Sequence, residues 1–281
     1  MAYVSIYRKY RPYNFDNVVG QEHIVRILRN QIKTDTIGHA YLFTGTRGTG
    51  KTSVAKIFAR SVNCPNHNDG GACGECAVCK EMANSSNLDI VEIDAASNNG
   101  VDEIRELRES VKYPPTIGRF KVYIIDEVHM LSIGAFNALL KTLEEPPAHV
   151  IFILATTEVH KLPQTILSRC LRFDFRLVPT ISIANRIKYI FDDMGIICTE
   201  DACLAIAEAG DGSVRDALSI ADMCVSYGEG KVDYNVVLDV LGQSNPNIII
   251  DIVECTLKGD VGTALSLIDG IANFGKSMSV L

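Results

Sequence analysis

"GTRGTGKT" occupies residues 45–52, between an apolar run at 40–44 and a helical pattern at 51–62. It fits G-x-x-x-x-G-K-[ST], the pattern of a loop that binds nucleotide phosphates between a strand and a helix. Backbone N–H groups and the helix N-terminus then surround the phosphates, so we expect Lys51 to reach the β and γ phosphates of ATP and Thr52 to bind Mg²⁺. A glycine-rich turn with a chance lysine is the alternative. The other residues expected around the nucleotide are Gly45, Thr46, Arg47, Gly48, Thr49 and Gly50.

Short apolar runs alternate with helical patterns on both sides of this loop. The runs are rich in β-branched residues and apolar on both faces, which is typical of buried parallel strands covered by helices. We therefore expect an α/β fold with a parallel sheet. The expected strands are 40–45, 88–94, 120–127 and 150–157, and the expected helices are 21–33, 51–62, 100–112 and 134–145.

Polar residues end two of the expected strands. "VYIIDEVHM" (122–130) places Asp126 and Glu127 at a strand tip, where we expect Asp126 to hold the Mg²⁺ shell and Glu127 to deprotonate the attacking water. Capping of the next helix is the alternative for this pair. "LATT" (154–157) places Thr156 and Thr157 at the same edge, where a hydroxyl can bond the γ-phosphate or the water; a structural turn is the alternative.

Four of the nine cysteines lie close together after the phosphate-binding loop. Cys64, Cys73, Cys76 and Cys79 have the spacing C-x₈-C-x₂-C-x₂-C, which suits one tetrahedral Zn²⁺. Four thiolates leave no open position, so we expect a structural zinc away from catalysis. Reduced, metal-free cysteines and a redox or iron–sulfur role are the alternatives. The remaining cysteines are scattered, which favours places in the core.

The pattern changes after residue 179, where we expect no further strands. Residues 180–242 read as a small helical domain, and residues 243–281 as the start of a third, helical domain that is cut short. Residues 1–179 are then the nucleotide-binding domain.

The composition restricts the class of protein. The net charge of −7 argues against coating nucleic acid by overall positive charge, so any DNA contact must be local. No secretory leader or membrane-spanning run is recognised, and we expect a cytoplasmic protein.

The motifs follow one another in a familiar order. The loop at 45–52, "DEVH" (126–129), "LATT", "ILSRC" (166–170) and "GSVRDALS" (212–219) resemble the gamma/tau subunits of bacterial DNA polymerase III clamp loaders, as do "RKYRPYNFDNVVGQEH" (8–23) and "HMLSIGAFNALLKTLEEPP" (129–147). The resemblance implies an AAA+ ATPase module, a helical lid and a collar domain that joins five subunits in a ring. It also implies ATP-dependent loading of a sliding clamp onto primed DNA, with ATP hydrolysis by this chain.

The resemblance further assigns roles to single residues. Arg169 would be an arginine finger given to the neighbouring subunit's ATP, Thr157 the first sensor, and Arg215 the second sensor on the γ-phosphate. On the residues alone, a surface or salt-bridged arginine is the alternative for Arg169. The adenine pocket would include Arg11, Pro12 and Val19.

DNA is expected to pass through the ring and to be held by its backbone. Arg105, Lys141 and Lys161 are candidates for that contact, although each is also consistent with a solvated surface charge. Two other functions stay open: another AAA+ machine, such as a branch-migration helicase, and a ring subunit that binds nucleotide without turnover.

Overall fold

A computed structural model of the 281-residue chain describes residues 3–83, 87–242 and 246–273. Its contacts form two compact units, Arg11–Val178 and the combination of Met1–Tyr10 with Pro179–Leu281. Within the described residues, no helix is both long enough and apolar enough to span a bilayer.

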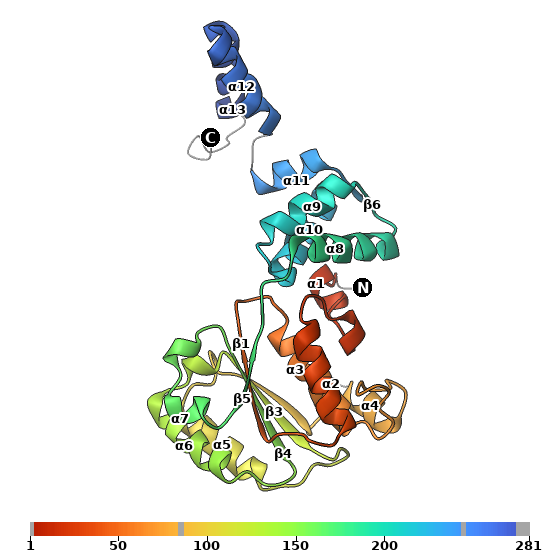
Figure 1. Cartoon of the computed structure of the whole chain (residues 1–281), viewed down its shortest axis with the longest axis vertical. Coiled ribbons are helices and arrows are strands. Elements are labelled where there is room, and N and C mark those ends of the chain that lie inside the picture. Colours follow the sequence, from red (N-terminus) through yellow and green to blue (C-terminus); the bar gives the residue numbers. More distant parts are fainter. Residues whose placement is uncertain (1–2, 84–86, 243–245, 274–281) are drawn as a thin grey trace. The chain divides into compact units, whose positions relative to one another are not determined.

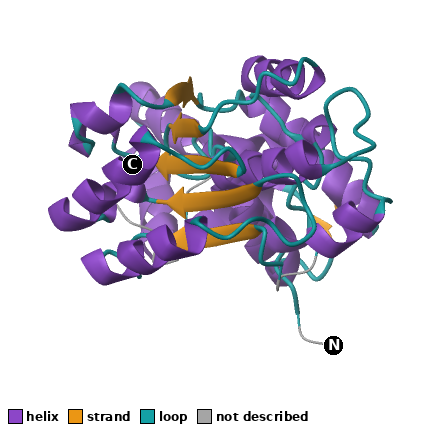
Figure 2. Ribbon diagram, turned by 90° about the horizontal axis from the view of Figure 1, so that it is seen from below, coloured by secondary structure: helices purple, strands orange, loops and turns teal. Residues whose placement is uncertain are grey.

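The unit Arg11–Val178 is built on a five-stranded parallel sheet with the order β2-β3-β4-β1-β5. Figure 2 shows strands of this sheet in orange, with helices around them. The fold class expected from the sequence is confirmed. The strands are β1 (Ala40–Thr44), β2 (Ile90–Asp94), β3 (Lys121–Asp126), β4 (Val150–Thr156) and β5 (Leu171–Asp174).

Both faces of the sheet are covered by helices (Figures 1 and 2). Alternate residues of β1 serve two separate cores: Tyr41 and Phe43 pack in one, and Ala40 and Leu42 in the other. The first core includes α2 and α3, and the second includes α5, α6 and α7. The helical segments of this unit, in which η marks a short 3₁₀ helix, are η1 (Phe15–Asn17), α2 (Glu22–Lys33), α3 (Lys51–Asn63), α4 (Ala77–Met82), α5 (Val101–Val111), η2 (Val128–Met130), α6 (Ile133–Glu144), η3 (Val159–Lys161) and α7 (Gln164–Leu167).

Two features of the sheet differ from the sequence-based expectation. The four expected strands are present, but β5 is an additional strand, whose sequence "LRFD" is short and mostly exposed. The expectation that every strand is apolar on both faces is wrong for β2, where Glu92 and Asp94 are exposed. The reason is that β2 lies at the edge of the sheet, where one side chain in two meets solvent.

The strand register brings the motif residues to one edge of the sheet. Thr44 at the end of β1 pairs with Thr156 at the end of β4, and Asp94 pairs with Asp126 across β2 and β3. Because parallel strands share their carboxyl edge, the phosphate-binding loop, the acidic pair and the threonine pair follow neighbouring strand ends.

The second unit contains a helical domain whose helices have clear local signals. Thr199, Ser213 and Asp233 each accept a backbone N–H with their side chains at a helix start, and Gly195 and Gly242 end helices with positive φ. The expectation of no strands after residue 179 is wrong, because a two-residue parallel pair is present. The elements are α8 (Thr180–Met194), β6 (Ile197–Cys198), α9 (Glu200–Ala209), α10 (Val214–Tyr227), β7 (Lys231–Val232) and α11 (Tyr234–Leu241).

The start of the chain packs within this second unit. The Tyr3 and Tyr10 hydroxyls donate hydrogen bonds to Asp222 on α10 and Asp193 on α8, on either side of α1 (Ile6–Lys9). The unit Arg11–Val178 thus differs from the expected domain 1–179 at its amino end, because the residues up to Tyr10 belong to the second unit. The other expected domain boundaries stay predictions.

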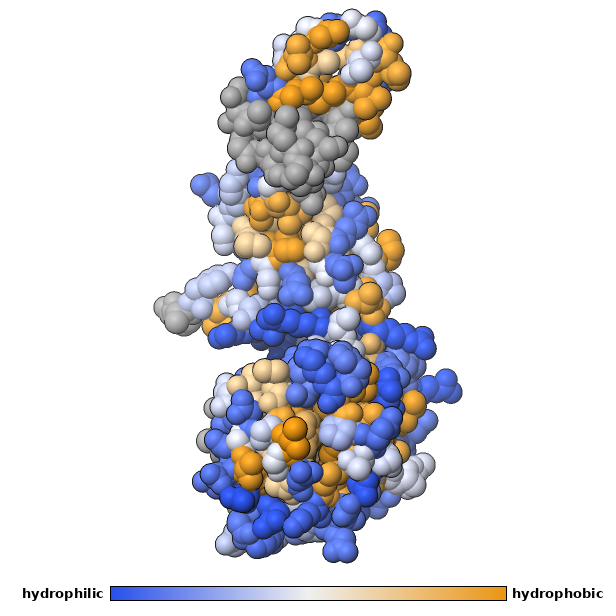
Figure 3. Space-filling view, turned by 90° about the vertical axis from the view of Figure 1, so that its left-hand side faces the viewer, coloured by the Kyte–Doolittle hydropathy of each residue, from blue (hydrophilic) through white to orange (hydrophobic). Residues whose placement is uncertain are grey.

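The last described elements are α12 (Pro246–Lys258) and α13 (Val261–Asn273), which contact each other. Both expose large apolar side chains, and Figure 3 shows this surface at its upper end. The residues are Ile250, Val253, Leu257, Val261 and Leu265. Surfaces of this kind are typical of segments that another helix or chain covers.

Candidate functional site

The phosphate-binding loop joins β1 to α3 in a conformation that needs glycine. Gly45 has a φ of +141°, and a Cβ there would lie 2.5 Å from the Phe175 carbonyl oxygen. Gly50 is left-handed, with a φ of 103°, and directly precedes the first residue of α3. Side chains at either position would be strained. The loop therefore places α3 with its free N–H groups at the strand edge.

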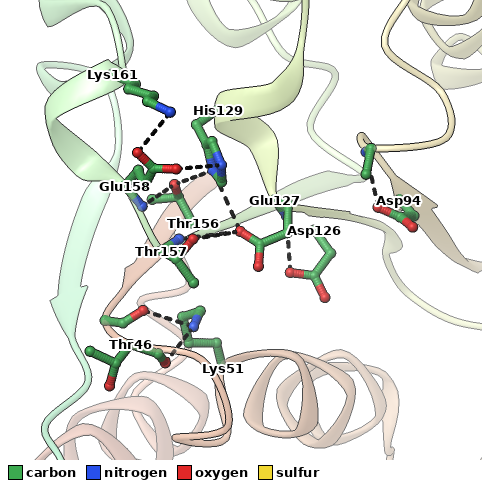
Figure 4. Close-up of polar contacts among 12 residues, drawn as sticks. Thr46, Lys51, Asp94, Asp126, Glu127, His129, Thr156, Thr157, Glu158 and Lys161 are labelled. Carbon is green, nitrogen blue, oxygen red and sulfur yellow. Dashed lines mark hydrogen bonds and ion pairs between the residues drawn. The ribbon is translucent and has the colours of Figure 1, made fainter.

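Lys51 is folded back into this loop. Its Nζ donates hydrogen bonds of 2.9 Å to the carbonyl oxygens of Gly45 and Thr46, and the residue is 5% exposed (Figure 4). Burial lowers the pKa of Lys51, while the nearby charges of Glu127 and Asp126 oppose that shift. Bound phosphate groups would favour the charged form of the Lys51 ammonium. They would be its anionic partner, whereas the loop carbonyls that it now contacts are neutral.

Thr52 and Asp126 meet beside the loop. The Thr52 hydroxyl donates a hydrogen bond of 2.7 Å to Asp126 Oδ2. A hydroxyl and a carboxylate are the hard oxygen donors that Mg²⁺ takes together with phosphate oxygens. These two residues therefore fit a Mg²⁺–nucleotide site, as the sequence predicts.

Glu127 turns toward the end of β4. It adopts a left-handed conformation with a φ of 47°, which is uncommon for a residue other than glycine. Its Oε2 accepts hydrogen bonds from the Thr157 hydroxyl at 3.0 Å and the Thr157 N–H at 3.3 Å (Figure 4). The expected base and the expected first sensor are thus in direct contact.

The two threonines of "LATT" face different surroundings. Thr156 is fully buried; its Oγ1 lies 3.0 Å from His129 Nδ1 and accepts the N–H of Glu158 at 3.0 Å. Thr157 is the one that reaches Glu127. The contact supports Thr157 over Thr156 as the sensor, and the role stays a prediction.

Two buried side chains with polar contacts near this site were not identified from the sequence. Gln21 is fully buried, and its Nε2 donates to the Arg176 carbonyl at 2.7 Å and to the Thr49 carbonyl of the loop at 3.4 Å. His129 stands in the quoted "DEVH" motif, but no sequence signal connects it to Glu158. Both depend on contacts between distant segments, which local patterns do not contain.

The expected adenine-pocket residues lie at the start of the unit. Arg11 Nε donates a hydrogen bond of 3.0 Å to the Ser53 hydroxyl on the first turn of α3. Pro12 and Val19 are partly buried. Arg11 is therefore beside the phosphate-binding helix, and the pocket itself stays a prediction.

Arg169 lies away from the phosphate-binding loop. It precedes β5, in which Leu171 pairs with Tyr41 near the amino end of β1, whereas the loop follows the carboxyl end of that strand. The guanidinium donates to Glu144 Oε1 at 2.8 Å and to the Thr165 carbonyl at 2.7 Å. Arg169 is thus a partly exposed, salt-bridged arginine near the amino ends of β1 and β5, opposite the carboxyl ends of the strands, where the loop lies.

Arg215 belongs to the other unit. It is the second residue of α10, and its guanidinium lies 5.2 Å from the centre of the Tyr7 ring. A cation in the first turn opposes the helix dipole, and the aromatic face offsets part of that conflict.

The candidate DNA contacts are surface residues. Arg105 pairs with Asp102 at 2.8 Å, and Lys161 pairs with Glu158 at 2.8 Å. Lys141 is exposed on α6. These positions agree equally with solvated charges, so the DNA assignment stays a prediction.

The four clustered cysteines form a compact site between α3 and α4. The sulfur atoms of Cys64, Cys73, Cys76 and Cys79 all lie within 4.8 Å of one another. The Cys64–Cys76 and Cys73–Cys79 sulfur pairs are 4.0 and 3.9 Å apart. Tetrahedral zinc with bonds of about 2.3 Å needs sulfur atoms about 3.8 Å apart. The arrangement therefore fits a structural zinc knuckle.

Backbone N–H groups near the sulfur atoms also favour deprotonated cysteines at this site. The N–H groups of Cys73, Cys76 and Cys79 point at the sulfurs of Cys64, Cys73 and Cys76, at 3.3 to 3.4 Å. The N–H groups of Cys76 and Glu75 lower the pKa of Cys73 to about 6, whereas burial raises the pKa of Cys79. Several thiolates in one cluster repel each other, and a divalent cation would compensate their charge.

Comparisons with known proteins agree with this geometry. A family model described as DNA polymerase III, delta subunit matches residues 20–179, and one described as DNA polymerase III clamp loader subunit, ATPase lid domain matches residues 182–230. The chain belongs to the gamma/tau family of DNA polymerase III clamp loader subunits. The resemblance seen in the sequence is confirmed.

Relatives in the gamma/tau family match nearly the whole chain. DNA polymerase III subunit tau of Bacillus subtilis is 49% identical over 281 residues, a match that covers 100% of this chain and 50% of that protein. The tau subunit of Escherichia coli is 44% identical, with 98% of this chain and 43% of that protein covered. The gamma subunit of Buchnera aphidicola subsp. Acyrthosiphon pisum is 42% identical, with 98% and 76% covered. The chain thus spans about half the length of the tau relatives.

Among solved structures, the RuvB Holliday junction branch migration motor of Thermotoga maritima is similar in fold. The TM-score is 0.63 at 19% sequence identity, and the match covers 83% of this chain and 72% of that one. At this identity the similarity shows the fold alone, a parallel sheet covered by helices and followed by a helical domain.

Proposed function

We propose that this chain is an ATP-hydrolysing motor subunit of a clamp loader, which opens a sliding clamp and places it on primed DNA. One observation carries the proposal: three features converge at the carboxyl ends of the strands. They are Lys51 of the phosphate-binding loop, the Thr52–Asp126 pair suited to Mg²⁺, and the Glu127 carboxylate held by Thr157. A subunit that only bound nucleotide would not need Glu127 in that place.

The residues divide the work of hydrolysis as follows. Lys51 would leave the loop carbonyls and pair with the β and γ phosphates, neutralising charge on the leaving group. Thr52 and Asp126 would hold Mg²⁺, which would supply positive charge that stabilises the phosphate groups. Glu127 would accept a proton from the attacking water, and Thr157 would orient that carboxylate or the γ-phosphate. Such a site depends on position more than on covalent chemistry.

The partners follow from the family and from the remaining residues. Arg169, on the far edge of the sheet, suits a neighbouring subunit's nucleotide in a five-membered ring better than its own. Arg215 would complete the site from the lid. Arg105, Lys141 and Lys161 would contact the phosphate backbone of primer-template DNA without reading sequence. The exposed apolar face of α12 and α13 is consistent with a collar that packs against other subunits.

The four-cysteine cluster would hold one structural zinc. All four positions of a tetrahedron would be filled by thiolates, so the metal has no open position for catalysis. It would stabilise the segment between α3 and β2.

The deciding experiment is ATP hydrolysis by the full-length protein assembled with its partner subunits, with and without sliding clamp and primed DNA. We expect turnover that clamp and DNA stimulate, and clamp loading that requires ATP. Glu127→Gln should bind ATP and hydrolyse it slowly, and Lys51→Ala should fail to bind it productively. Binding without turnover in the complete wild-type complex would favour the non-hydrolysing subunit, and branch migration without clamp loading would favour the other AAA+ machine.

A further inference from the structure

His129 lies between two carboxylates next to the proposed catalytic base. Its side chain is 6% exposed. Its Nδ1 is 3.4 Å from Glu127 Oε2 and 3.0 Å from Thr156 Oγ1, and its Nε2 is 3.3 Å from Glu158 Oε1 (Figure 4). A buried imidazole with polar groups at both nitrogens has a fixed ring plane, because a rotation would break contacts on both sides.

The contacts of Glu127 are concentrated on one of its two carboxylate oxygens. Oε2 accepts hydrogen bonds from the hydroxyl and the N–H of Thr157, and it also faces His129 Nδ1. The other oxygen points away from these groups, toward the side on which Lys51 lies (Figure 4). The charge of Glu127 acts on the pKa of Lys51, so the two side chains are within electrostatic range. Fixing Oε2 therefore orients the second oxygen toward the site of the phosphates.

Glu158 in turn fixes the ring of His129. Its carboxylate is held on the other side by Lys161 at 2.8 Å, and the hydrogen bond from Lys161 lowers the pKa of Glu158. The Glu158 N–H donates to Thr156 Oγ1 at 3.0 Å. Residues from the ends of β3 and β4 thus close a polar network around His129.

We infer that His129 is a positioning residue for Glu127: it holds the carboxylate in the orientation needed to accept a proton from water, and Glu158 holds His129. This inference rests on the proposed ATP hydrolysis. The contacts of His129 are with Glu127, Thr156 and Glu158 rather than with the phosphate-binding loop, so its loss should reduce the chemical step and leave nucleotide binding nearly unchanged.

The test compares three substitutions of His129 in the full-length protein assembled with its partner subunits. An asparagine amide nitrogen can take the place of Nδ1, which faces Glu127, whereas a glutamine amide reaches the place of Nε2, which faces Glu158. We expect His129→Leu and His129→Gln to lower kcat on the order of 10- to 100-fold, and His129→Asn to lower it less. The dissociation constant for ATP should change little in all three. His160→Leu is the matched control, because this exposed histidine also approaches Glu158, at 3.6 Å, and should leave kcat unchanged.

A double substitution separates positioning from a general structural role. If His129 acts through Glu127, then Glu127→Gln with His129→Leu should be no slower than Glu127→Gln alone. A further fall in the double variant, equal rates for His129→Asn and His129→Leu, or a loss of ATP binding that matches the loss of turnover would overturn the inference. Thermal unfolding of each variant shows whether it is folded, and the more conservative His129→Asn keeps the comparison usable if His129→Leu is not.

The outcomes also distinguish this inference from the function on which it rests. A slow Glu127→Gln together with fully active His129 variants would reject only the role of His129. A wild-type complex without turnover, or a fully active Glu127→Gln, would reject the proposed hydrolysis at Glu127 itself.

Discussion

The Thr52 hydroxyl donates a 2.7 Å hydrogen bond to Asp126 Oδ2, which ties the first turn of α3 to the tip of β3. The contact links residues 74 positions apart in the chain. Both oxygens are suited to Mg²⁺, so the pair that stabilises the site without nucleotide is the pair proposed to bind the metal with it.

Asp126→Asn should weaken Mg²⁺-dependent ATP binding, because an amide lacks the negative charge of the carboxylate. We expect the Mg²⁺ concentration needed for half-maximal ATP binding to rise by about tenfold or more, which corresponds to about 1.4 kcal/mol. Titration of Mg²⁺ at fixed ATP measures it. Asp94→Asn is the matched control: Asp94 pairs with Asp126 in the sheet but accepts the Ala96 N–H at 3.0 Å in its own loop. An equal shift in both variants would contradict the metal role of Asp126.

Protein purified without chelator should contain about one zinc per chain, because four thiolates complete one tetrahedral shell. Cys76→Ser should lower the zinc content and destabilise the segment around α4, since structural metal binding is coupled to local folding. ATP affinity should fall little, because no residue of the phosphate-binding loop lies among the zinc ligands. Elemental analysis and protease sensitivity of residues 64–79 provide the measurements. Cys255→Ser serves as a control for loss of an unrelated thiol, and a wild-type protein without zinc would contradict the metal site.

The sequence predicts well the part of the molecule that carries the nucleotide-binding motifs. The phosphate-binding loop and the Asp126–Glu127 pair are local patterns, and buried strands of β-branched residues place them at one edge of the sheet. β5 and the β6–β7 pair were not predicted because short, half-exposed strands have little hydrophobic periodicity. The network around His129 was not predicted because it joins the ends of β3 and β4, and residue spacing alone does not describe a contact between distant segments.

Asp89 offers a test of how the edge strand β2 is held. Its carboxylate accepts the backbone N–H groups of Thr116, Ile117 and Gly118, at 2.6 to 2.8 Å, and the residue is 1% exposed. Burial raises the pKa of Asp89, but these three donors outweigh it and the net shift is downward. Asp89→Asn should therefore lower the free energy of unfolding at pH 7 by about 1.5 to 3 kcal/mol, the range for hydrogen bonds to a charged group.

The pH dependence of this effect has a definite sign. The folded-state pKa of Asp89 is below its unfolded value, so its stabilisation is fully present above the unfolded pKa, about 3.9, and is lost as the pH falls through the folded pKa. The stability gap between wild type and Asp89→Asn should narrow on acidification below about pH 4. Urea unfolding at several pH values measures it. Asp35→Asn, at an exposed ion pair with Arg119, should change stability far less, and a gap that widened at low pH would contradict the assignment.

Arg169 should act on the nucleotide of a neighbouring subunit. A guanidinium that meets the charge developing on the γ-phosphoryl oxygens is worth on the order of 10³ to 10⁵ in rate in well-studied nucleotide hydrolases. Here the side chain is held by Glu144 at 2.8 Å, on the sheet edge opposite the loop, so it is available to a partner once that ion pair opens. Arg169→Ala should leave ATP binding by the isolated subunit unchanged and remove most of the ATPase activity of the complex. Arg172→Ala removes a nearby surface ion pair with Asp174 and should have little effect.

Mixing two inactive variants tests whether Arg169 acts between subunits. In a complex that contains Arg169→Ala and Lys51→Ala subunits, some interfaces join an intact arginine from the Lys51→Ala subunit to an intact phosphate-binding loop from the Arg169→Ala subunit. We expect ATPase activity to reappear in the mixture, because only an arginine supplied by the neighbour can complete such a site. An arginine that served its own nucleotide would give no recovery at any ratio. A mixture as inactive as its components would contradict action between subunits, and weaker ATP binding by isolated Arg169→Ala would indicate instead a local structural role through its contact with Glu144.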